Sequence, residues 1–380
     1  MNILVVCHYG LYQDFGSSFV HNQVKAFVAA GHRVRVIIPL PVGKIFQGNR
    51  LGPALITKQA DGVDIFYVRF LSASNYGEKY FNAKSVVWAV SGQLRKILKD
   101  WSADVIHAHT LGLDSCLGAW LKKKMRRPLV VTTHGSDTEK PLKNGELGRL
   151  KAMCDQADRV VAVSRCLQQR LLSCHPETPV CTILNGFVPN KAEADARKAP
   201  FSIVQVGHLI PSKRNAVTIQ ALAQLREEYP QMKLTVIGAG YLRQQLEELV
   251  TELRLTEAVT FTGEIPNPQV LAAMAKATYF IMPSKPEGFG IVYLEAMYNR
   301  CITIGTEGEG ISELIVSGEN GFLVPADNPE AIVDAVRWCQ ANPEAAAAIG
   351  EQGRRDTEAL TWKQNAQRYT DLFRELIGEK

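Results

Sequence analysis

Two glutamates separated by seven residues are the first candidates for chemistry in this chain. The segment "PSKPEGFGIVYLEAM" places Glu287 in a stretch rich in proline and glycine and Glu295 inside the apolar run that follows. We expect a helix to begin near Phe289 or Gly290, so that the amides of residues 288–292 form an anion site at the positive end of the helix dipole. A carboxylate beside a diphosphate needs other hydrogen-bond donors, and sugar hydroxyls are suitable. The pattern therefore favours a nucleotide sugar as ligand; the alternative is that both glutamates are solvated surface residues.

Cationic and glycine-rich turns elsewhere in the second half could serve the same phosphates. The segment "VGHLIPSKRN" supplies Lys213 and Arg214 shortly after an expected strand, and "VIGAG" places Gly238 where another strand ends. A glycine-rich turn that leads into a helix presents unpaired amides to a phosphate. We assign Lys213, Arg214 and Gly238 to donor binding, although an exposed basic turn and a purely structural glycine would have the same sequences.

Histidines at expected strand ends are the candidates in the first half. The segments "IHAHT" and "VTTHGSDTEK" contain His107, His109, His134 and Asp137. A metal pair is disfavoured because no third ligand follows at a useful spacing. His134 is best placed to hydrogen-bond a sugar or to assist a proton transfer. We assign His109 and Asp137 to an acceptor site, while a structural role for His107 and His109 remains open.

Alternating strands and helices must position these residues. Short β-branched runs such as "NILVVCH", "DVIHAH" and "PLVVTTH" alternate with amphipathic stretches, which predicts parallel βαβ units. The pattern stops at "NGFVPNKAEADARKAP" and restarts with "FSIVQVG" and "KLTVIGAG". We therefore predict an α/β protein of two Rossmann-like, doubly wound parallel-sheet domains that face each other across a cleft. The expected boundaries are 1–187, 188–360 and a final helix over 361–380.

Composition agrees with two globular domains. A chain of 380 residues, with 46% hydrophobic and 21% charged residues, is long enough for two cores and unlike a disordered, collagenous or disulfide-rich protein. The eight cysteines form no CxxC pair. We expect no signal peptide or membrane span, reduced thiols and a cytoplasmic location. Charge is uneven, since residues 1–187 carry 24 Lys and Arg against 13 Asp and Glu.

The motifs together resemble one enzyme family. The segments "FGSSFVHNQVKAF", "THGSD", "ADRVVAVS", "ILNGF", "VGHLIPSK", "VIGAG", "FTGEIPNPQV", "PSKPEGFGIVYLEAM" and "GISELIVSGENGFLVPADNPEAI" resemble the family 4 glycosyltransferases of the GT-B fold, in family order and over nearly the whole chain. The resemblance implies retaining transfer of a sugar from a nucleotide-sugar donor to an acceptor hydroxyl, with no metal or other cofactor. The first domain would bind the acceptor and the second would bind the donor. The last helix would cross back onto the first domain, and its Trp362 and Phe373 would be anchors between the two domains.

The resemblance also implies roles for individual residues. Glu287 resembles the contact to the donor sugar, Glu295 the contact to the ribose and Lys213 the diphosphate clamp, so that Glu287, Lys213 and His134 form the expected catalytic set. His208 stands where the family usually has arginine, which leaves the clamp to Lys213 or Arg214. His208 is itself expected to bind the donor, and the other expected donor contacts are Gly16, Ser17, Ile265, Phe289, Gly290, Ile291 and Val292. The substituted clamp motivates one alternative, a non-catalytic partner that binds nucleotide sugars or polymers on the same fold; the intact Glu287, Glu295 and Lys213 argue against it.

The basic charge of the first half, together with the resemblance, leads to expectations about the acceptor and about contact with a membrane. We expect a UDP- or GDP-sugar donor and a sugar, polysaccharide or lipid-linked acceptor of cell-envelope assembly. "LKKKMRRP" (Leu121–Pro128) and "LRKILKDW" (Leu94–Trp101) could rest on an anionic membrane, or could be solvated helix ends. We do not expect nucleic-acid binding, because no reader motif accompanies the charge.

Overall fold

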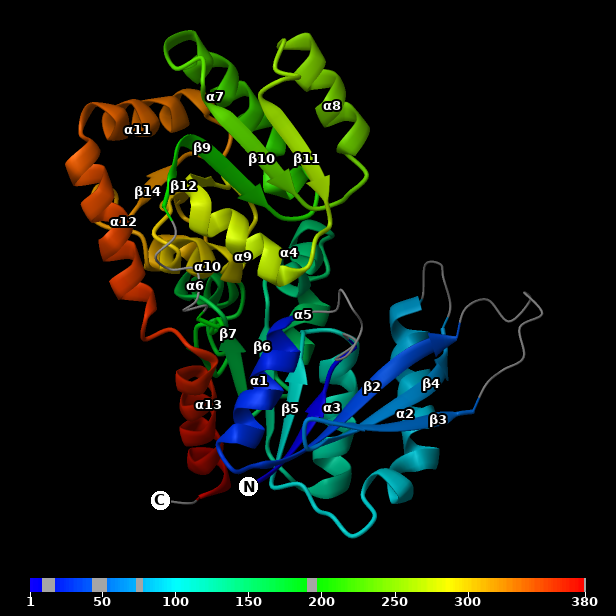
Figure 1. Cartoon of the computed structure of the whole chain (residues 1–380). Coiled ribbons are helices and arrows are strands. Elements are labelled where there is room, and N and C mark those ends of the chain that lie inside the picture. Colours follow the sequence, from blue (N-terminus) through cyan, green and yellow to red (C-terminus); the bar gives the residue numbers. More distant parts are fainter. Residues whose placement is uncertain (9–17, 43–52, 73–77, 190–196, 379–380) are drawn as a thin grey trace. The chain divides into compact units, whose positions relative to one another are not determined.

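The fold consists of two compact α/β units. The computed structural model describes residues 1–8, 18–42, 53–72, 78–189 and 197–378. The first unit comprises Met1–Gly186 with Trp362–Lys380, and the second comprises Phe187–Thr361. Figure 1 shows the elements of both units, most of them labelled. Within the described ranges, no helix is both long enough and apolar enough to cross a membrane.

The first unit is built on an eight-stranded sheet in the order β3-β4-β2-β1-β5-β6-β7-β8. Every pairing in it is parallel except that of β3 with β4. The strands are β1 (Asn2–Val6), β2 (Arg33–Val42), β3 (Leu55–Ala60), β4 (Val63–Leu71), β5 (Val105–His109), β6 (Leu129–Thr133), β7 (Arg159–Ala162) and β8 (Val180–Thr182).

Strand β3, which was not among the expected strands, adds an antiparallel edge to an otherwise parallel sheet. It pairs antiparallel with β4 at the edge of the sheet. The two strands are joined by Asp61 and Gly62, with φ angles of 50° and 76°. Positive φ at both central residues is the geometry of a tight hairpin whose twist matches its strands, and an Asp-Gly pair is a strong signal for it. The polar residues of "LITKQA" concealed the strand because an edge strand needs no continuous apolar run.

Helices cover both faces of this sheet. One buried cluster includes Leu4 and Val6 of β1 with Val90 and Leu117; another includes Ile3 and Val5 of the same strand with helix residues from the opposite face. Alternate residues of one strand thus enter two cores, as a doubly wound sheet requires. The helices are α1 (Ser18–Ala29), α2 (Glu78–Ile97), α3 (Leu113–Met125), α4 (Ser136–Lys143), α5 (Leu147–Cys154), α6 (Arg165–Cys174) and α13 (Trp362–Ile377).

The last helix, α13, is part of the first unit although it comes from the end of the chain. Asn365 accepts a hydrogen bond from Gln23 of α1 at 2.8 Å, and Thr370 lies 2.8 Å from Nε2 of His32. Phe373 is fully buried and packs against Phe27, with ring centroids 5.8 Å apart. Phe373 is therefore a core residue of the first unit.

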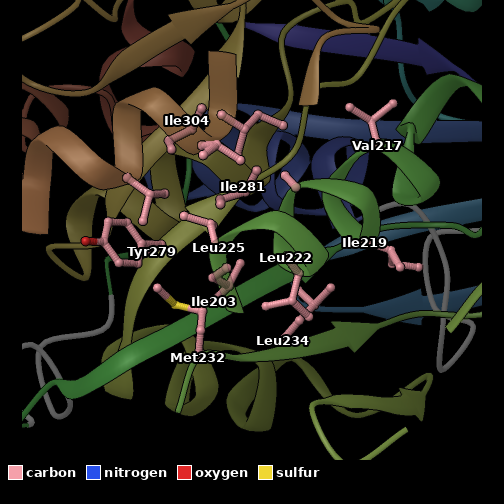
Figure 2. Close-up of a cluster of buried hydrophobic side chains, with 14 of the residues drawn as sticks. Ile203, Val217, Ile219, Leu222, Leu225, Met232, Leu234, Tyr279, Ile281 and Ile304 are labelled. Atoms are coloured by element: carbon pink, nitrogen blue, oxygen red, sulfur yellow. The ribbon is translucent and has the colours of Figure 1, made fainter. Parts of the chain in front are cut away.

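The second unit has a six-stranded parallel sheet in the order β11-β10-β9-β12-β13-β14. Figure 2 shows one of its buried clusters, with Ile203, Leu225, Tyr279 and Ile304 among the side chains. The strands are β9 (Ala199–Val206), β10 (Lys233–Ile237), β11 (Val259–Gly263), β12 (Ala277–Ile281), β13 (Ile302–Thr306) and β14 (Phe322–Val324). The helices are α7 (Asn215–Glu228), α8 (Arg243–Glu252), α9 (Asn267–Lys276), α10 (Ile291–Tyr298), α11 (Pro329–Ala341) and α12 (Pro343–Thr357), with 3₁₀ turns η1 (Pro211–Lys213) and η2 (Gly310–Glu313).

The strand orders identify where each unit can hold a ligand. In the second unit the chain leaves β9 toward β10 and β11, then returns to place β12 on the other side of β9. In the first unit β1 lies between β2 and β5 in the same way. Connections that diverge from neighbouring parallel strands leave a crevice at the carboxyl ends of those strands, where open α/β sheets bind ligands. The loops after β9 and β12 therefore border the crevice of the second unit, and those after β1 and β5 border that of the first.

Candidate functional site

The Glu-x7-Glu segment follows β12 at the crevice of the second unit. Helix α10 begins at Ile291, one residue beyond the predicted start, with Gly290 as its N-cap. Gly290 has φ 79°, and a Cβ there would lie 2.6 Å from the ring of Tyr293. Glycine is thus required for the chain to turn into the helix. Ile291 and Val292 occupy the first turn, whose amides have no partner within a helix, and Phe289 before them is buried at 1% exposure.

Glu287 is held by contacts to its side chain and to its backbone. Its carboxylate forms an ion pair with Lys213, and Oε2 accepts a hydrogen bond from Ser284 Oγ at 2.9 Å. Its backbone amide donates to Oε2 of Glu309 at 2.8 Å, and Glu309 is 1% exposed. These contacts fix the carboxylate at the end of β12. Neither Ser284 nor Glu309 was predicted, because no local spacing links them to Glu287.

Lys213 comes from the loop after β9, across the crevice from the β12 loop. It ends η1, and its carbonyl accepts a hydrogen bond from Gln205 at 3.0 Å. The Lys285 amide donates to the Ser212 carbonyl at 2.7 Å and joins the two loops. The ion pair with Glu287 places Lys213 beside the Glu-x7-Glu segment. That Lys213 binds a diphosphate remains a prediction.

Gly238 belongs to the turn after β10, next to the β9 loop. A Cβ on Gly238 would lie 2.1 Å from the carbonyl oxygen of Gly207, and Gly238 has φ 137°. Both facts exclude a side chain there. The two turns can therefore approach closely only because the position is glycine.

The remaining predicted donor residues do not all join this cluster. Arg214 directs Nε to Asp327 Oδ1 at 2.6 Å and does not contact Glu287 in the described structure. His208 is exposed in the loop after β9. Ile265 lies between β11 and α9 and packs against a buried cluster that includes Tyr293. Gly16 and Ser17 lie outside the described residues.

Glu295 differs in its surroundings from Glu287. It lies in the second turn of α10, where burial raises its pKa to about 7. Asn267 Nδ2 lies 3.5 Å from Oε1. A carboxyl group with this pKa is partly protonated near neutrality, so it can donate as well as accept a hydrogen bond.

The histidines of the first unit form a buried stack at the ends of β5 and β6. His109 Nδ1 lies 3.2 Å from His134 Nε2, and the two rings are stacked with centroids 5.5 Å apart. His107, behind them, lies 2.8 Å from Thr132 Oγ1. Burial lowers the pKa of His107 to about 3 and that of His134 to about 4. These rings are neutral at physiological pH, and His109, at 1% exposure, packs as a core residue.

Asp137 organises the loop that carries His134. Its Oδ1 accepts hydrogen bonds at 3.0 Å from the amides of His134 and Gly135, and its Oδ2 accepts one at 2.8 Å from Leu111. Three amides on one carboxylate join the β5 and β6 loops. Within the described ranges, no group of three or more His, Cys, Asp or Glu side chains is arranged to hold a metal ion.

Two protein-family models match the sequence, one over most of the first unit and one within the second. A model described as Glycosyltransferase Family 4 matches residues 16–191, and one described as Glycosyl transferases group 1 matches residues 189–356. The chain belongs to the family 4 glycosyltransferases. The suspected resemblance is confirmed, and this glycosyltransferase has the GT-B fold with a nucleotide-sugar donor as its class of substrate.

Individual relatives of this glycosyltransferase are distant. A GDP-mannose-dependent alpha-(1-6)-phosphatidylinositol monomannoside mannosyltransferase of Mycolicibacterium smegmatis is 25% identical over 75% of this chain and 80% of its own. The structure of a sucrose-phosphate synthase from Thermosynechococcus elongatus has a TM-score of 0.79 at 22% identity, covering 99% of both chains. HepE of Anabaena, in complex with UDP and glucose, has a TM-score of 0.76 at 20% identity, covering 99% of this chain and 100% of its own. The two structures support the fold alone.

Proposed function

We propose that this family 4 glycosyltransferase is a retaining hexosyltransferase that moves a sugar from a UDP- or GDP-sugar to an acceptor hydroxyl. The observation that carries the proposal is the Lys213–Glu287 ion pair at the β9/β12 crevice, next to the N-terminus of α10. A cation and unpaired helix amides suit a diphosphate, and a carboxylate held beside them suits sugar hydroxyls. The second unit would bind the donor and the first the acceptor.

The mechanism in this proposal is electrostatic. As the bond between the sugar and the diphosphate breaks, Lys213 and the amides of residues 290–292 stabilise the negative charge of the leaving group. Glu287 binds the transferred sugar, Glu295 binds the ribose, and neutral His134 offers a hydrogen bond. The departing phosphate accepts the proton of the acceptor hydroxyl, so no separate general base is needed. The proposal also includes no metal ion and no protein nucleophile.

One experiment tests donor class and stereochemistry together. UDP-glucose, UDP-galactose, UDP-N-acetylglucosamine and GDP-mannose are each incubated with the full chain, released nucleotide is measured, and the anomeric configuration of any product is read by NMR. We expect turnover with one donor and retention at the anomeric carbon. Inversion would refute the retaining mechanism. Tight binding of a donor without turnover on any acceptor would favour the alternative, a non-catalytic binding partner.

We further propose that the acceptor belongs to cell-envelope polysaccharide or glycolipid assembly and that the first unit contacts an anionic membrane from the cytoplasmic side. Helices α2 and α3 pack together, and Trp88 of α2 is 74% exposed. Trp88 and Trp120 line a cavity of about 400 Å³. An exposed tryptophan on a helix whose last turn is basic suits the interface of an anionic bilayer. The exposed cations at the ends of these helices are Arg95, Lys96, Lys99, Lys123, Lys124, Arg126 and Arg127.

A further inference from the structure

The ion pair at the β9/β12 crevice is formed by the two side chains that the proposed function assigns to the donor. Lys213 is expected to bind the diphosphate and Glu287 the transferred sugar, yet in this structure each is the partner of the other. Both side chains are largely buried, and the neighbouring cation, Arg214, pairs with Asp327 instead. The ammonium of Lys213 can therefore reach a phosphate only in competition with the carboxylate of Glu287.

Glu287 is the fixed member of this pair. Its amide donates to Oε2 of Glu309 at 2.8 Å, and its carbonyl accepts a hydrogen bond from the amide of Gly310 at 3.3 Å. A Cβ on Gly310 would lie 2.1 Å from the carbonyl oxygen of Gly288, so the two loops touch backbone to backbone. Ser284, which is fully buried, donates from Oγ to the carboxylate itself. These contacts involve no cation, so they hold the carboxylate at the end of β12 when its ion pair is broken.

Lys213 is the member that can move. Its backbone is fixed, because its amide donates to the carbonyl of Ile210 at 3.0 Å and its own carbonyl accepts from buried Gln205 at 3.0 Å. The side chain is an unbranched stem beside Gly207, and a Cβ on Gly207 would lie 3.6 Å from this stem. Rotation about the bonds of the stem moves the ammonium without a change in the backbone, and its donors can then turn toward a phosphate.

The substrate and the product of transfer compensate the two charges differently. When a nucleotide sugar binds, the diphosphate takes the ammonium and the sugar hydroxyls donate to the carboxylate, so both charges keep partners. The released nucleoside diphosphate has no sugar, and its terminal phosphate carries more negative charge than the diphosphate of the donor. This product draws Lys213 away and leaves Glu287 without a cation, next to an anion. A largely buried charge that loses its partner is costly.

We propose that Glu287 selects the nucleotide sugar over the free nucleoside diphosphate by competing with the diphosphate for the ammonium of Lys213. Re-formation of the ion pair after transfer then favours release of the product. The inference rests on the proposed function, in which the second unit binds the donor, and it adds to the sugar contact of Glu287 a role in discrimination between substrate and product.

Calorimetry of the full chain with UDP and GDP tests the proposal without turnover. Glu287→Gln keeps the shape of the side chain and an oxygen that accepts from Ser284, but it removes the charge that holds Lys213. Whichever nucleotide the wild type binds more tightly should bind this variant about fivefold more tightly, which corresponds to about 1 kcal/mol for a partly exposed ion pair. The one of the four nucleotide sugars that binds the wild type most tightly should gain no affinity, because its hydroxyls lose their bonds to a carboxylate.

The background of Lys213→Met separates competition from direct repulsion. A carboxylate also repels a phosphate, and Glu287→Gln would relieve this repulsion in any background. If Glu287 acts through Lys213, the gain in nucleotide affinity should fall below about twofold when the double variant is compared with Lys213→Met alone. The matched control is Glu228→Gln, which removes the same charge from the exposed ion pair with Arg337 in the same unit and should leave nucleotide affinity unchanged.

Each unfavourable result is assigned to this inference or to the proposed function. Equal or weaker binding of the nucleotide by Glu287→Gln, a gain that persists in Lys213→Met, or an equal gain for the nucleotide sugar or in Glu228→Gln would overturn the competition. If the wild type transfers sugar in the same experiments, the transferase stands. A wild type that binds neither nucleotide and none of the four nucleotide sugars would refute the proposed function and this inference with it. The expected binding pattern without transfer to any acceptor would refute the enzyme and leave the competition.

Discussion

The ion pair between Lys213 and Glu287 gives the sharpest prediction for stability. The two side chains are 19% and 13% exposed. Lys213→Met keeps the apolar stem but leaves Glu287 with Ser284 and without its cation. Breaking a fully buried pair costs about 3–5 kcal/mol; because solvent still reaches these two side chains, we expect a loss of about 2 kcal/mol in the free energy of unfolding. Glu287→Gln should cost about 1 kcal/mol, because the freed ammonium can turn toward solvent.

The double variant tests whether the two side chains interact in solution. If they form the pair, Lys213→Met combined with Glu287→Gln should be more stable than the sum of the two single losses, by about 1 kcal/mol. Urea unfolding of the four proteins measures this coupling. Additive losses would refute the ion pair.

Catalysis should respond much more strongly than stability. Removal of one group that stabilises transition-state charge lowers kcat by about 10²–10³, or roughly 3–4 kcal/mol, and we expect Lys213→Met to fall in this range with the preferred nucleotide sugar. Glu287→Ala should lose transfer as well. The control is Arg337→Met, which removes an exposed ion pair with Glu228 in the same unit and should keep the wild-type rate. A folded Lys213→Met with wild-type turnover would remove Lys213 from the site.

Four further predictions concern other parts of the molecule. Burial raises the pKa of Glu295 from 4.5 to about 7, so the protonated carboxyl stabilises the fold at pH 4.5 and this stabilisation is lost as the pH rises through 7. Glu295→Gln does not titrate. Its free energy of unfolding in urea, relative to that of the wild type, should therefore increase by roughly 2 kcal/mol between pH 4.5 and pH 8. An equal difference at both pH values would contradict this. Gly238→Ala should destabilise the chain and weaken binding of UDP or GDP in calorimetry, whereas Gly318→Ala, with φ 83° but open space around it, should cost only about 1 kcal/mol and bind normally. Transfer should continue at the wild-type rate after dialysis against EDTA, and loss of activity that Mg²⁺ or Mn²⁺ restores would refute the metal-free mechanism. Trp88→Ala should reduce sedimentation with vesicles of anionic lipid, while Tyr241→Ala, equally exposed at 75% but on the second unit, should not; unchanged sedimentation of Trp88→Ala would refute the membrane surface.

Much of the fold followed from local patterns in the chain. Continuous apolar runs bounded by glycine and polar residues predict buried parallel strands, and the predicted runs in both halves are strands in the structure. Strand β3 was missed because its three consecutive polar residues, Thr57, Lys58 and Gln59, leave no such run, although the Asp61-Gly62 turn signalled a hairpin. The start of α10 was predicted to within one residue, since glycine marks where the chain must turn.

The candidate site was predictable only in part. Glu287 and Glu295 lie in one segment, so their spacing is visible in the sequence. Lys213 could be assigned to the same ligand because a diphosphate attracts a cation. Ser284 and Glu309 had no such signal, because their contacts with Glu287 depend on how two loops fold against each other. Arg214 was expected to reach the same phosphates, but its side chain pairs with Asp327.

By itself, the sequence determined the βαβ alternation, the family and the two glutamates, because periodicity and spacing are properties of neighbouring residues. Only the tertiary structure decided which distant groups meet. Lys213 and Glu287 are 74 positions apart, and His8 and Asp114 are 106 apart. Both pairs form where strand order places β9 beside β12 and β1 beside β5. Strand order arises from long-range packing of whole sheets, so no local pattern encodes these contacts.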